Sequence, residues 1–361
     1  MAPLSVGVVG GGLCGMAVSA FLRRSACAVT VYDGGSSPAL GFSRTASAVA
    51  GGLLHPLTPS LKLAWEGEAA LHEADALVAA AEAAAGENVV ATDVVLRPAA
   101  DAADAEKLRR AAAASPWLEW LDAGAFAEAA GRPRSLGGAR YVGGKVVDPK
   151  AYLAALAALA AAPGGGAFAR VAGDVADPRA ILSAHDAVVV AGGAEAFAAR
   201  RGDLFPERAG LTLTRGESVV VGGAGRAALL QGTYLCPGRG GDAVLGATHD
   251  HVRDGDDVAR AFAEPRAAED LVAGGLAGAA AALLPPGAPL LGATAGVRLN
   301  GPRTHRGRLP VAGRREPGLW VAGALGARGL LRHAQLGRAV ADAVLHDDPG
   351  RIPPALRLDF E

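Results

Sequence analysis

The stretch LSVGVVGGGLCGMAVSAFLRRSACAVTVYD, residues 4–33, decides the fold of this chain. Residues 4–10 form a short run rich in Val, which predicts a β-strand, and residues 13–24 have the pattern of an apolar helix. Residues 28–32 predict a second strand, which Asp33 closes. Strand, Gly-rich turn, helix and strand in this order make a β-α-β unit, so we expect a parallel sheet here.

The turn of this unit carries Gly10, Gly12 and Gly15 in the spacing G-x-G-x-x-G. The first two glycines of this motif allow a tight turn and the close approach of a pyrophosphate, and the third lets helix and strand pack closely. Free N–H groups at the helix N-terminus attract phosphate, and Asp33 is placed to accept from ribose hydroxyls. A Gly-rich turn without a ligand is the alternative, but the order of the elements favours a bound dinucleotide.

Residues 219–228 imitate this motif, with Gly223, Gly225 and Ala228 in fingerprint spacing after a strand pattern. The apolar stretch that follows covers only residues 227–230, which is too short for the helix that such a site requires. We therefore expect a hairpin turn there and no second dinucleotide site.

Alanine-rich helical patterns fill much of the chain after the first unit. We expect helices at residues 61–85, 103–129 and 149–162. The last begins with Asp148 as an N-cap acid and Pro149 at the first helical position. Three tryptophans on apolar faces of the first two patterns are expected in the core: Trp65, Trp117 and Trp120.

The end of the chain repeats the strand, Gly-rich turn and helix pattern of its beginning. Residues 319–322 predict a strand, 323–329 a Gly-rich turn and 330–345 a helix, and residues 187–190 predict another buried strand. Residues 211–248 are instead typical of short antiparallel strands. The fold class is therefore α/β: a discontinuous Rossmann-like domain with an inserted, mainly antiparallel β-sheet substrate domain of α+β character. In this division the nucleotide-binding domain comprises residues 1–60, 141–205 and 300–361, and the substrate domain residues 61–140 and 206–299.

Composition excludes several classes of protein. With 361 residues, 51% hydrophobic residues and a net charge of −1, the chain is a globular protein without the basic excess of a nucleic-acid binder. Its three cysteines (Cys14, Cys27 and Cys236) are too few for a disulfide framework. No basic leader is visible before the first strand, so we expect a soluble, intracellular protein. The sequence does not distinguish the cytoplasm from an organelle. The uncharged run at residues 271–297 is broken by Gly and Pro, which predicts a soluble helix and then a loop rather than a membrane span.

Five segments in order resemble the D-amino-acid oxidase/glycine oxidase (DAO) family over essentially the whole chain. The first three are the N-terminal fingerprint with Asp33, residues 45–56 (TASAVAGGLLHP) and residues 143–149. The fourth is residues 233–234, with Tyr234, followed by 244–248, and the fifth is residues 295–298, with Arg298, 309–313 and 323–331. The family more often carries Glu at the position of Asp33. Within the family, residues 52–57 and 326–331 look most like the oxidase module of the bifunctional enzyme that makes 5-methylaminomethyl-2-thiouridine in tRNA.

The resemblance implies noncovalently bound FAD and a site for a small amine or amino acid. Three residues are implied in catalysis: Arg298 as a bidentate carboxylate clamp, Tyr234 as its hydrogen-bonding neighbour, and Arg328 near the flavin or the substrate. Candidates for cofactor binding are Gly10, Gly12, Leu13, Cys14, Gly15, Asp33, Ser47, Gly51, Gly52, Leu53, Val171, Gly192, Gly326, Gly329 and Leu330. The implied reaction is hydride transfer from Cα to flavin, followed by hydrolysis of the imine, with oxygen or another acceptor taking the electrons.

Each assignment has an alternative. Arg298 could instead be a surface or domain-interface arginine, and Tyr234 could be an ordinary aromatic residue of the sheet. His55 is a candidate for the substrate side of the site, and the alternative is a loop residue without a functional role. His249 and His251 lack a third ligand at a workable spacing, so we expect no metal. A second hypothesis is an RNA substrate: a tRNA whose modified wobble uridine loses a carboxymethyl group by oxidation. It is suggested by a local cluster of five arginines: Arg303, Arg306, Arg308, Arg314 and Arg315. A third is an FAD-binding scaffold without turnover. The oligomeric state is left open.

Overall fold

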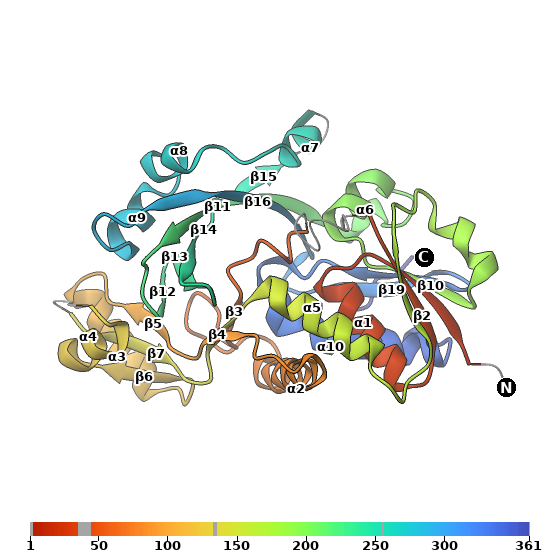
Figure 1. Ribbon diagram of the computed structural model, residues 1–361, viewed down its shortest axis with the longest axis horizontal. Coiled ribbons are helices and arrows are strands. Elements are labelled where there is room, and N and C mark those ends of the chain that lie inside the picture. The colour runs from red at the N-terminus through yellow and green to blue at the C-terminus, as the bar shows by residue number, and fades with distance from the viewer. Residues whose placement is uncertain (1–2, 35–44, 133–135, 254–255, 361) are drawn as a thin grey trace.

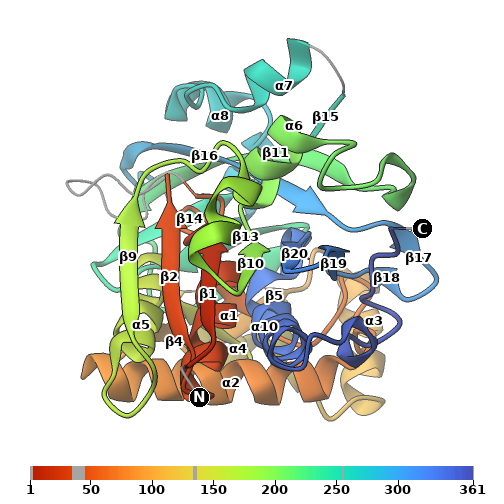
Figure 2. The same ribbon diagram turned by 90° about the vertical axis from the view of Figure 1, so that its right-hand side faces the viewer.

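The first sheet joins segments from both ends of the chain. The computed structural model describes residues 3–34, 45–132, 136–253 and 256–360. Six strands pair in the order β19-β20-β10-β1-β2-β9, and all neighbours are parallel except β19 and β20 (Figure 2). Their bounds are β1 Ser5–Val9, β2 Ala28–Asp33, β9 Phe168–Ala172, β10 Ala187–Val190, β19 Val311–Glu316 and β20 Leu319–Gly323. The expected β-α-β unit and the expected C-terminal strand are confirmed.

Helices cover both faces of this sheet. On one face lie α1 (Leu13–Arg24), α2 (Gly67–Ala85), α5 (Pro149–Ala161) and α10 (Gly329–Leu345) (Figure 1). The Asp148 carboxylate accepts hydrogen bonds from the Lys150 and Ala151 amides, so the expected N-cap of α5 is confirmed. On the other face lie the short helix η1 (Pro178–Ala184) and α6 (Gly193–Arg200). The N-terminal ends of α1 and α10 therefore meet the same edge of the sheet.

A second, larger sheet has the strand order β15-β11-β14-β13-β12-β5-β7-β6, with β16 also paired to β11. Every pairing is antiparallel except that of β12 with β5. Its strands are β5 Val95–Pro98, β6 Leu118–Leu121, β7 Gly138–Tyr141, β11 Thr212–Gly222, β12 Ala228–Gln231, β13 Thr233–Pro237, β14 Asp242–Gly246, β15 Asp250–Val252 and β16 Leu290–Asn300. The antiparallel sheet expected from residues 211–248 is thus confirmed.

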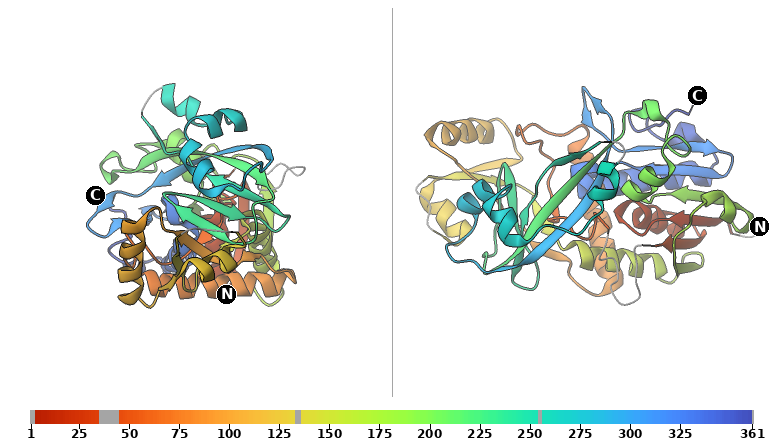
Figure 3. Two further views of the ribbon diagram at one scale, coloured as in Figure 1. Left: turned by 90° about the vertical axis from the view of Figure 1, so that its left-hand side faces the viewer. Right: turned by 90° about the horizontal axis from the view of Figure 1, so that it is seen from above.

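The long strands β11 and β16 connect the two sheets (Figure 3). They pair from Thr212 opposite Asn300 to Val221 opposite Leu290, and Asn300 also bridges to Leu325 beyond β20. Three helices lie beside the outer part of these strands: α7 Asp256–Ala261, α8 Ala268–Ala273 and α9 Ala277–Leu283. Because β16 ends beside the turn that leads into α10, residues near the end of β16 lie close to the edge of the first sheet.

The remaining elements are small. A three-stranded sheet contains β3 Leu53–Leu54, β8 Lys145–Val147 and β4 Val90–Thr92, and β17 Arg303–Thr304 pairs with β18 Gly307–Arg308 as a hairpin. The other helices are α3 Ala102–Ala113, α4 Ala123–Ala130, η2 Glu207–Ala209, η3 Gly326–Arg328 and η4 Pro349–Arg351. Within the described part of the chain, no helix has both the length and the apolar character needed to cross a membrane.

Three expectations about elements were wrong. Residues 103–129 form no continuous helix: α3 ends before Pro116, which lacks a backbone N–H, and β6 then pairs with β7. Residues 290–297 are the first part of β16 rather than a loop, because β11 supplies its hydrogen-bonding partner. Residues 219–228 make no hairpin, since β11 pairs with β14 and β12 with β13. The segment after the Gly-rich turn at 223–227 is a strand, not the helix of a dinucleotide site.

The packing of α2 bears on the division into domains. Its residues Leu71, Leu77 and Val78 belong to the same hydrophobic core as β1 and α10. The sequence-based division assigned residues 61–85 to the substrate domain, whereas this helix packs on the first sheet; it also starts at Gly67 rather than 61. Trp65, Trp117 and Trp120 are half-buried and pack at the margins of the hydrophobic cores.

Candidate functional site

The glycines of the N-terminal motif make contacts that a side chain would prevent. Gly10 has φ +116°, and a β-carbon there would meet Ala191 and Gly192 at 2.6 to 2.8 Å. A β-carbon on Gly15 would come within 1.9 Å of the Gly10 carbonyl oxygen, so helix α1 packs directly on the turn. Sequence reasoning placed Gly192 at this site, and the structure brings it against Gly10.

The N-terminus of α1 presents backbone amides rather than a capping side chain. Gly12 is its N-cap residue and makes no side-chain cap. The hydroxyl of Ser47 accepts a hydrogen bond from the Leu13 amide at 3.2 Å, and a β-carbon on Gly12 would approach the same hydroxyl to 3.1 Å. Cys14 follows in the first turn and is buried. The helix dipole, the other amides of the first turn and a close backbone make this end suited to a pyrophosphate.

Asp33 closes the other side of the turn. It is 3% exposed, and a β-carbon on Gly11 would come within 2.2 Å of its Oδ2. An Nη of Arg170 lies 3.5 Å from that oxygen. Val171, the next residue of β9, is 43% exposed beside Tyr32 and lines a cavity of about 460 Å³ with it. A carboxylate at the end of β2, beside the Gly-rich turn, suits the hydroxyls of a ribose.

The two ends of the chain meet at this turn. A β-carbon on Gly329 would contact Leu13 Cδ1 at 3.5 Å, and Leu330 is buried beside it. Gly326 has φ +58°, and a β-carbon there would lie 3.2 Å from the Asn300 side-chain oxygen. The Gly326–Arg328 turn is therefore placed between the first helix and the end of β16.

Tyr234 lies on β13 and faces the strap formed by residues 51–55. A β-carbon on Gly51 would come within 2.4 Å of Tyr234 Cε2. Burial raises the pKa of Tyr234, while hydrogen bonds with Ser218 and the Gly51 backbone oppose that rise. Gly52, with φ +76°, accepts a hydrogen bond from the Val147 amide at 2.8 Å, and Leu53 begins β3. The strap is thus held between β8 and the tyrosine.

Arg298 lies on β16 beside Tyr234. Its Nη2 is fully buried and makes no hydrogen bond to any residue that the structure describes. Burial lowers the pKa of this guanidinium, and the neighbouring Tyr234 acts in the opposite direction. Burial and then the charge of Arg298 lower the pKa of His249, which places that histidine in the same neighbourhood. A buried cation lacking a partner is costly, so this atom is suited to a ligand anion.

Arg328 and His55 form the other side of the site. Arg328 is half-buried, and burial lowers the pKa of its guanidinium. Burial, followed by the charge of Arg328, lowers the pKa of His55 to about 4, so His55 is neutral at neutral pH. Its Nδ1 accepts a hydrogen bond from the Leu57 amide at 3.2 Å, and its ring lies 4.8 Å from that of Tyr141.

Several of these residues were missed by sequence reasoning. Ser218, Tyr141 and Gly11 each touch a predicted site residue through a long-range contact. His249 was considered only as a metal ligand; in the described ranges no group of three His, Cys, Asp or Glu side chains is placed to hold a metal. Gly11 is the middle residue of the run Gly10-Gly11-Gly12, and this third glycine, which the motif does not require, was its only signal in the sequence.

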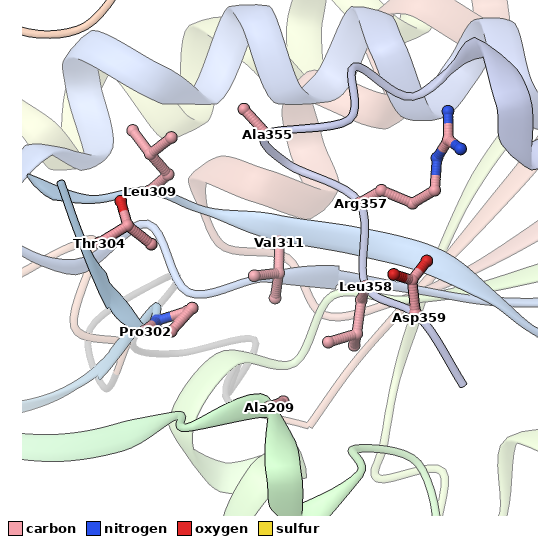
Figure 4. Close-up of a pocket in the computed structure, with 9 residues that line it drawn as sticks. All are labelled: Ala209, Pro302, Thr304, Leu309, Val311, Ala355, Arg357, Leu358 and Asp359. Atoms are coloured by element: carbon pink, nitrogen blue, oxygen red, sulfur yellow. The ribbon is translucent and has the colours of Figure 1, made fainter. Parts of the chain in front are cut away.

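A separate pocket of about 320 Å³ lies between β19, the β17–β18 hairpin and the C-terminal segment (Figure 4). Leu309, Val311 and Leu358 give it an apolar lining, with Arg357 and Asp359 at one side. None of the predicted site residues is among those that line it, so it is distinct from the site described above.

Comparison with known proteins agrees with this geometry. Glycine oxidase from Geobacillus kaustophilus is similar with a TM-score of 0.73 and 24% identity, covering 99% of this chain and 98% of that one. Glycine oxidase from Bacillus cereus ATCC 14579 gives 0.77 and 21% over 99% of each chain. Iminodiacetate oxidase from Chelativorans sp. BNC1 gives 0.73 and 18% over 98% of this chain and 100% of that one. These TM-scores establish a shared fold.

Comparison with curated protein sequences finds no significant match. The resemblance to the tRNA-modifying oxidase module is not tested by these comparisons and stays a prediction. The family model for FAD dependent oxidoreductases (DAO) matches residues 5–343, nearly the whole length. The chain therefore belongs to the DAO family of FAD-dependent oxidoreductases.

Proposed function

We propose that this protein oxidises the C–N bond of an amino acid or an N-substituted glycine. One observation carries the proposal: the buried Nη2 of Arg298, beside Tyr234, makes no hydrogen bond to a described residue. A guanidinium fork binds a carboxylate through two parallel hydrogen bonds. A substrate that bears a carboxylate next to its amine supplies that partner. Glycine oxidases and an iminodiacetate oxidase, which share the fold, are named for substrates of this class.

The fit of FAD rests on the cradle at the chain ends. The Gly12 amide and the first turn of α1 would hold the pyrophosphate, and Asp33 the ribose, with the adenine beside Val171. The turn at 326–329 and the start of α10 at Leu330 would direct backbone N–H groups to the pyrimidine edge of the flavin. Gly51, Gly52 and Leu53 would line its ring. We expect no covalent link.

The reaction divides between cofactor and protein. FAD, when bound, supplies the two-electron acceptor for the hydride that leaves the substrate Cα. Arg298 fixes the substrate carboxylate, and the Tyr234 hydroxyl adds a hydrogen bond to the same group, so that the Cα–H bond has one orientation. Such positioning contributes several kcal/mol to lowering a barrier. The substrate, having lost a hydride from Cα and a proton from its nitrogen, becomes an imine that water hydrolyses to a carbonyl compound and an amine.

Anaerobic mixing of the FAD-loaded enzyme with glycine, sarcosine and larger N-alkyl glycines tests the proposal. We expect the flavin absorbance to bleach with at least one of them. Arg298→Gln is expected to raise KM by tenfold or more, because it removes the charge and the fork. Arg303→Gln, which removes an exposed arginine of the hairpin, is the matched control and leaves KM unchanged. Failure of every amine carboxylate to bleach the flavin favours the scaffold hypothesis.

An RNA substrate has narrower support. Of the five clustered arginines, Arg314 pairs with Asp347 and Arg315 donates to the Asp203 carbonyl. The exposed basic surface is then the hairpin with Arg303, Arg306 and Arg308. Binding of a tRNA across salt concentrations tests it, since phosphate contacts give a steep decrease in affinity with salt. A flat response contradicts the RNA hypothesis and leaves the amino-acid proposal intact.

A further inference from the structure

The guanidinium of Arg328 has no partner among the residues that the structure describes. Arg328 is the last residue of η3 and the N-cap of α10, and its guanidinium is half-buried. Across the described ranges its guanidinium makes neither a hydrogen bond nor an ion pair, and burial alone lowers its pKa. A positive charge that is partly removed from water without a counter-ion is unfavourable. The carboxylate held by Arg298 does not need it, because one guanidinium fork already matches both carboxylate oxygens.

The acidic and basic groups around Arg328 increase this imbalance. Arg332, one turn along α10, bonds the Trp65 carbonyl and donates to the Gln335 side chain at 3.0 Å. Glu66, the nearby acid, accepts from Gln335 at 2.6 Å. The charge of Arg328, after burial, helps lower the pKa of Arg332 to about 10. Glu66 therefore offsets part of the charge of Arg332, and the net charge of Arg328, Arg332 and Glu66 together is positive.

His55 adds a second donor next to Arg328. The Leu57 amide donates to His55 Nδ1, so the neutral ring carries its proton on Nε2. Helix α10 packs against β3, the strand that immediately precedes His55. A neutral imidazole N–H and a guanidinium are both donors, and together they match an anionic oxygen acid.

This pair lies apart from Arg298, on segments that contact the strands carrying Arg298 and Tyr234. Arg298 adjoins Tyr234 and His249, whereas Arg328 adjoins His55. The strap runs from Gly51, under the Tyr234 ring, to His55, and four extended residues span at most about 14 Å. The Asn300–Leu325 bridge ties the backbones that carry the two arginines. The two arginines therefore lie on directly connected segments of the chain.

We propose that Arg328 and His55 form a second anion subsite, so that the preferred substrate is an amine bearing two acidic groups. Arg298 holds the carboxylate next to the reacting carbon, and the subsite holds a second carboxylate on the nitrogen substituent or on the side chain. The inference rests on the proposed amine oxidation and specifies its substrate class.

Two non-oxidisable ligands measure the subsite without turnover. Thiodiacetate carries two carboxylates, and its monoamide replaces one of them with a neutral group of nearly the same size. Their dissociation constants are read from the change that each causes in the absorbance of the FAD-loaded enzyme. We expect thiodiacetate to bind about ten- to a hundredfold more tightly than the monoamide, as for a charge-assisted hydrogen-bonded pair. Arg328→Gln and His55→Ala are expected to reduce this ratio to below threefold, while Arg303→Gln preserves it.

The same comparison with oxidisable substrates separates this inference from the proposed function. Iminodiacetate and its monoamide are compared by kcat/KM, and the wild-type enzyme is expected to favour the diacid by a similar factor. If the enzyme oxidises amines with one carboxylate and shows no preference for the diacid, the subsite is overturned and the proposed function is not. If the preference for the diacid is unchanged in Arg328→Gln and the flavin spectrum changes instead, Arg328 interacts with the flavin rather than with the substrate. This result also overturns the subsite. No flavin reduction by any amine carboxylate overturns the proposed function itself.

Discussion

The ring of Tyr234 lies directly against Gly51, so closely that a β-carbon at position 51 would come within 2.4 Å of Cε2. This contact joins the strap that we assign to the flavin with the strand that carries the substrate-side tyrosine. Contacts of this length are not tolerated between a β-carbon and a ring atom. The absence of a side chain at Gly51 therefore sets the position of Tyr234 relative to Arg298.

We expect Gly51→Ala to displace the Tyr234 ring and to lower kcat/KM for an amine carboxylate by about tenfold or more, since misplacement by about 1 Å has large effects on rate. Steady-state kinetics on protein with matched FAD content measures this. Gly278→Ala is the control, because a β-carbon at Gly278 meets no atom within 4 Å. A kcat/KM within twofold of the wild type for Gly51→Ala contradicts the assigned role of the contact.

Gly11 and Asp33 form a similar contact in the cradle for the cofactor. A β-carbon on Gly11 would overlap the Asp33 carboxylate, at 2.2 Å from Oδ2 and 2.6 Å from Cγ. Gly11→Ala is expected to push the carboxylate from its position and to weaken FAD binding by about tenfold, the effect of losing one charge-assisted hydrogen bond. Titration of apoprotein with FAD, followed by flavin fluorescence, gives the dissociation constant. Unchanged affinity would show that Asp33 does not hold the ribose.

Local sequence patterns were sufficient where one segment contains the whole feature. The β-α-β unit at residues 4–33 holds its strand, turn, helix and closing acid within one stretch, and each was found where expected. The same holds for the N-cap at Asp148 and the C-terminal strand, turn and helix. In these segments the backbone requirement and the residue that meets it are close in sequence.

Structural features that depend on residues far apart in the sequence could not be predicted from local sequence patterns. The uncharged segment 290–297 has no strand signal of its own and becomes β16 because β11 lies beside it. Ser218 and Tyr141 reach the site across strand pairs that no spacing reveals. The residues of the site were named through family resemblance, and their roles stay proposals until the variants above are measured.

The buried pair Tyr152 and His333 gives the fold a pH dependence. His333 Nδ1 lies 2.8 Å from the Leu330 carbonyl, so it carries the proton, and Nε2 accepts from the Tyr152 hydroxyl at 2.6 Å. Burial lowers the pKa of His333 to about 4, below the ordinary value of 6.5. Between these values the unfolded chain binds the proton and the folded protein does not, so stability decreases as pH falls from 6.5 to about 4.

The expected loss from His333 over this range is about 3 kcal/mol, at about 1.4 kcal/mol per pKa unit. Denaturant unfolding of the FAD-loaded protein at several pH values measures the slope. His333→Gln is expected to flatten it by about one proton, and His72→Gln, on the exposed side of α2, is expected to leave it unchanged. Equal slopes in the His333 variant and the wild type would rule out this source of acid sensitivity.

The attachment of FAD is the last point that the side chains address. A covalent link requires a nucleophile, and the thiolate rather than the thiol is the reactive form of cysteine. Burial raises the pKa of Cys14 to about 12 and also raises that of Cys27 and Cys236. His55, the other candidate, has Nδ1 bonded by the Leu57 amide and the proton on Nε2. We therefore expect acid precipitation to leave the protein colourless and to release all FAD into the supernatant; yellow colour in the washed pellet that disappears in His55→Ala would identify a covalent bond at that residue.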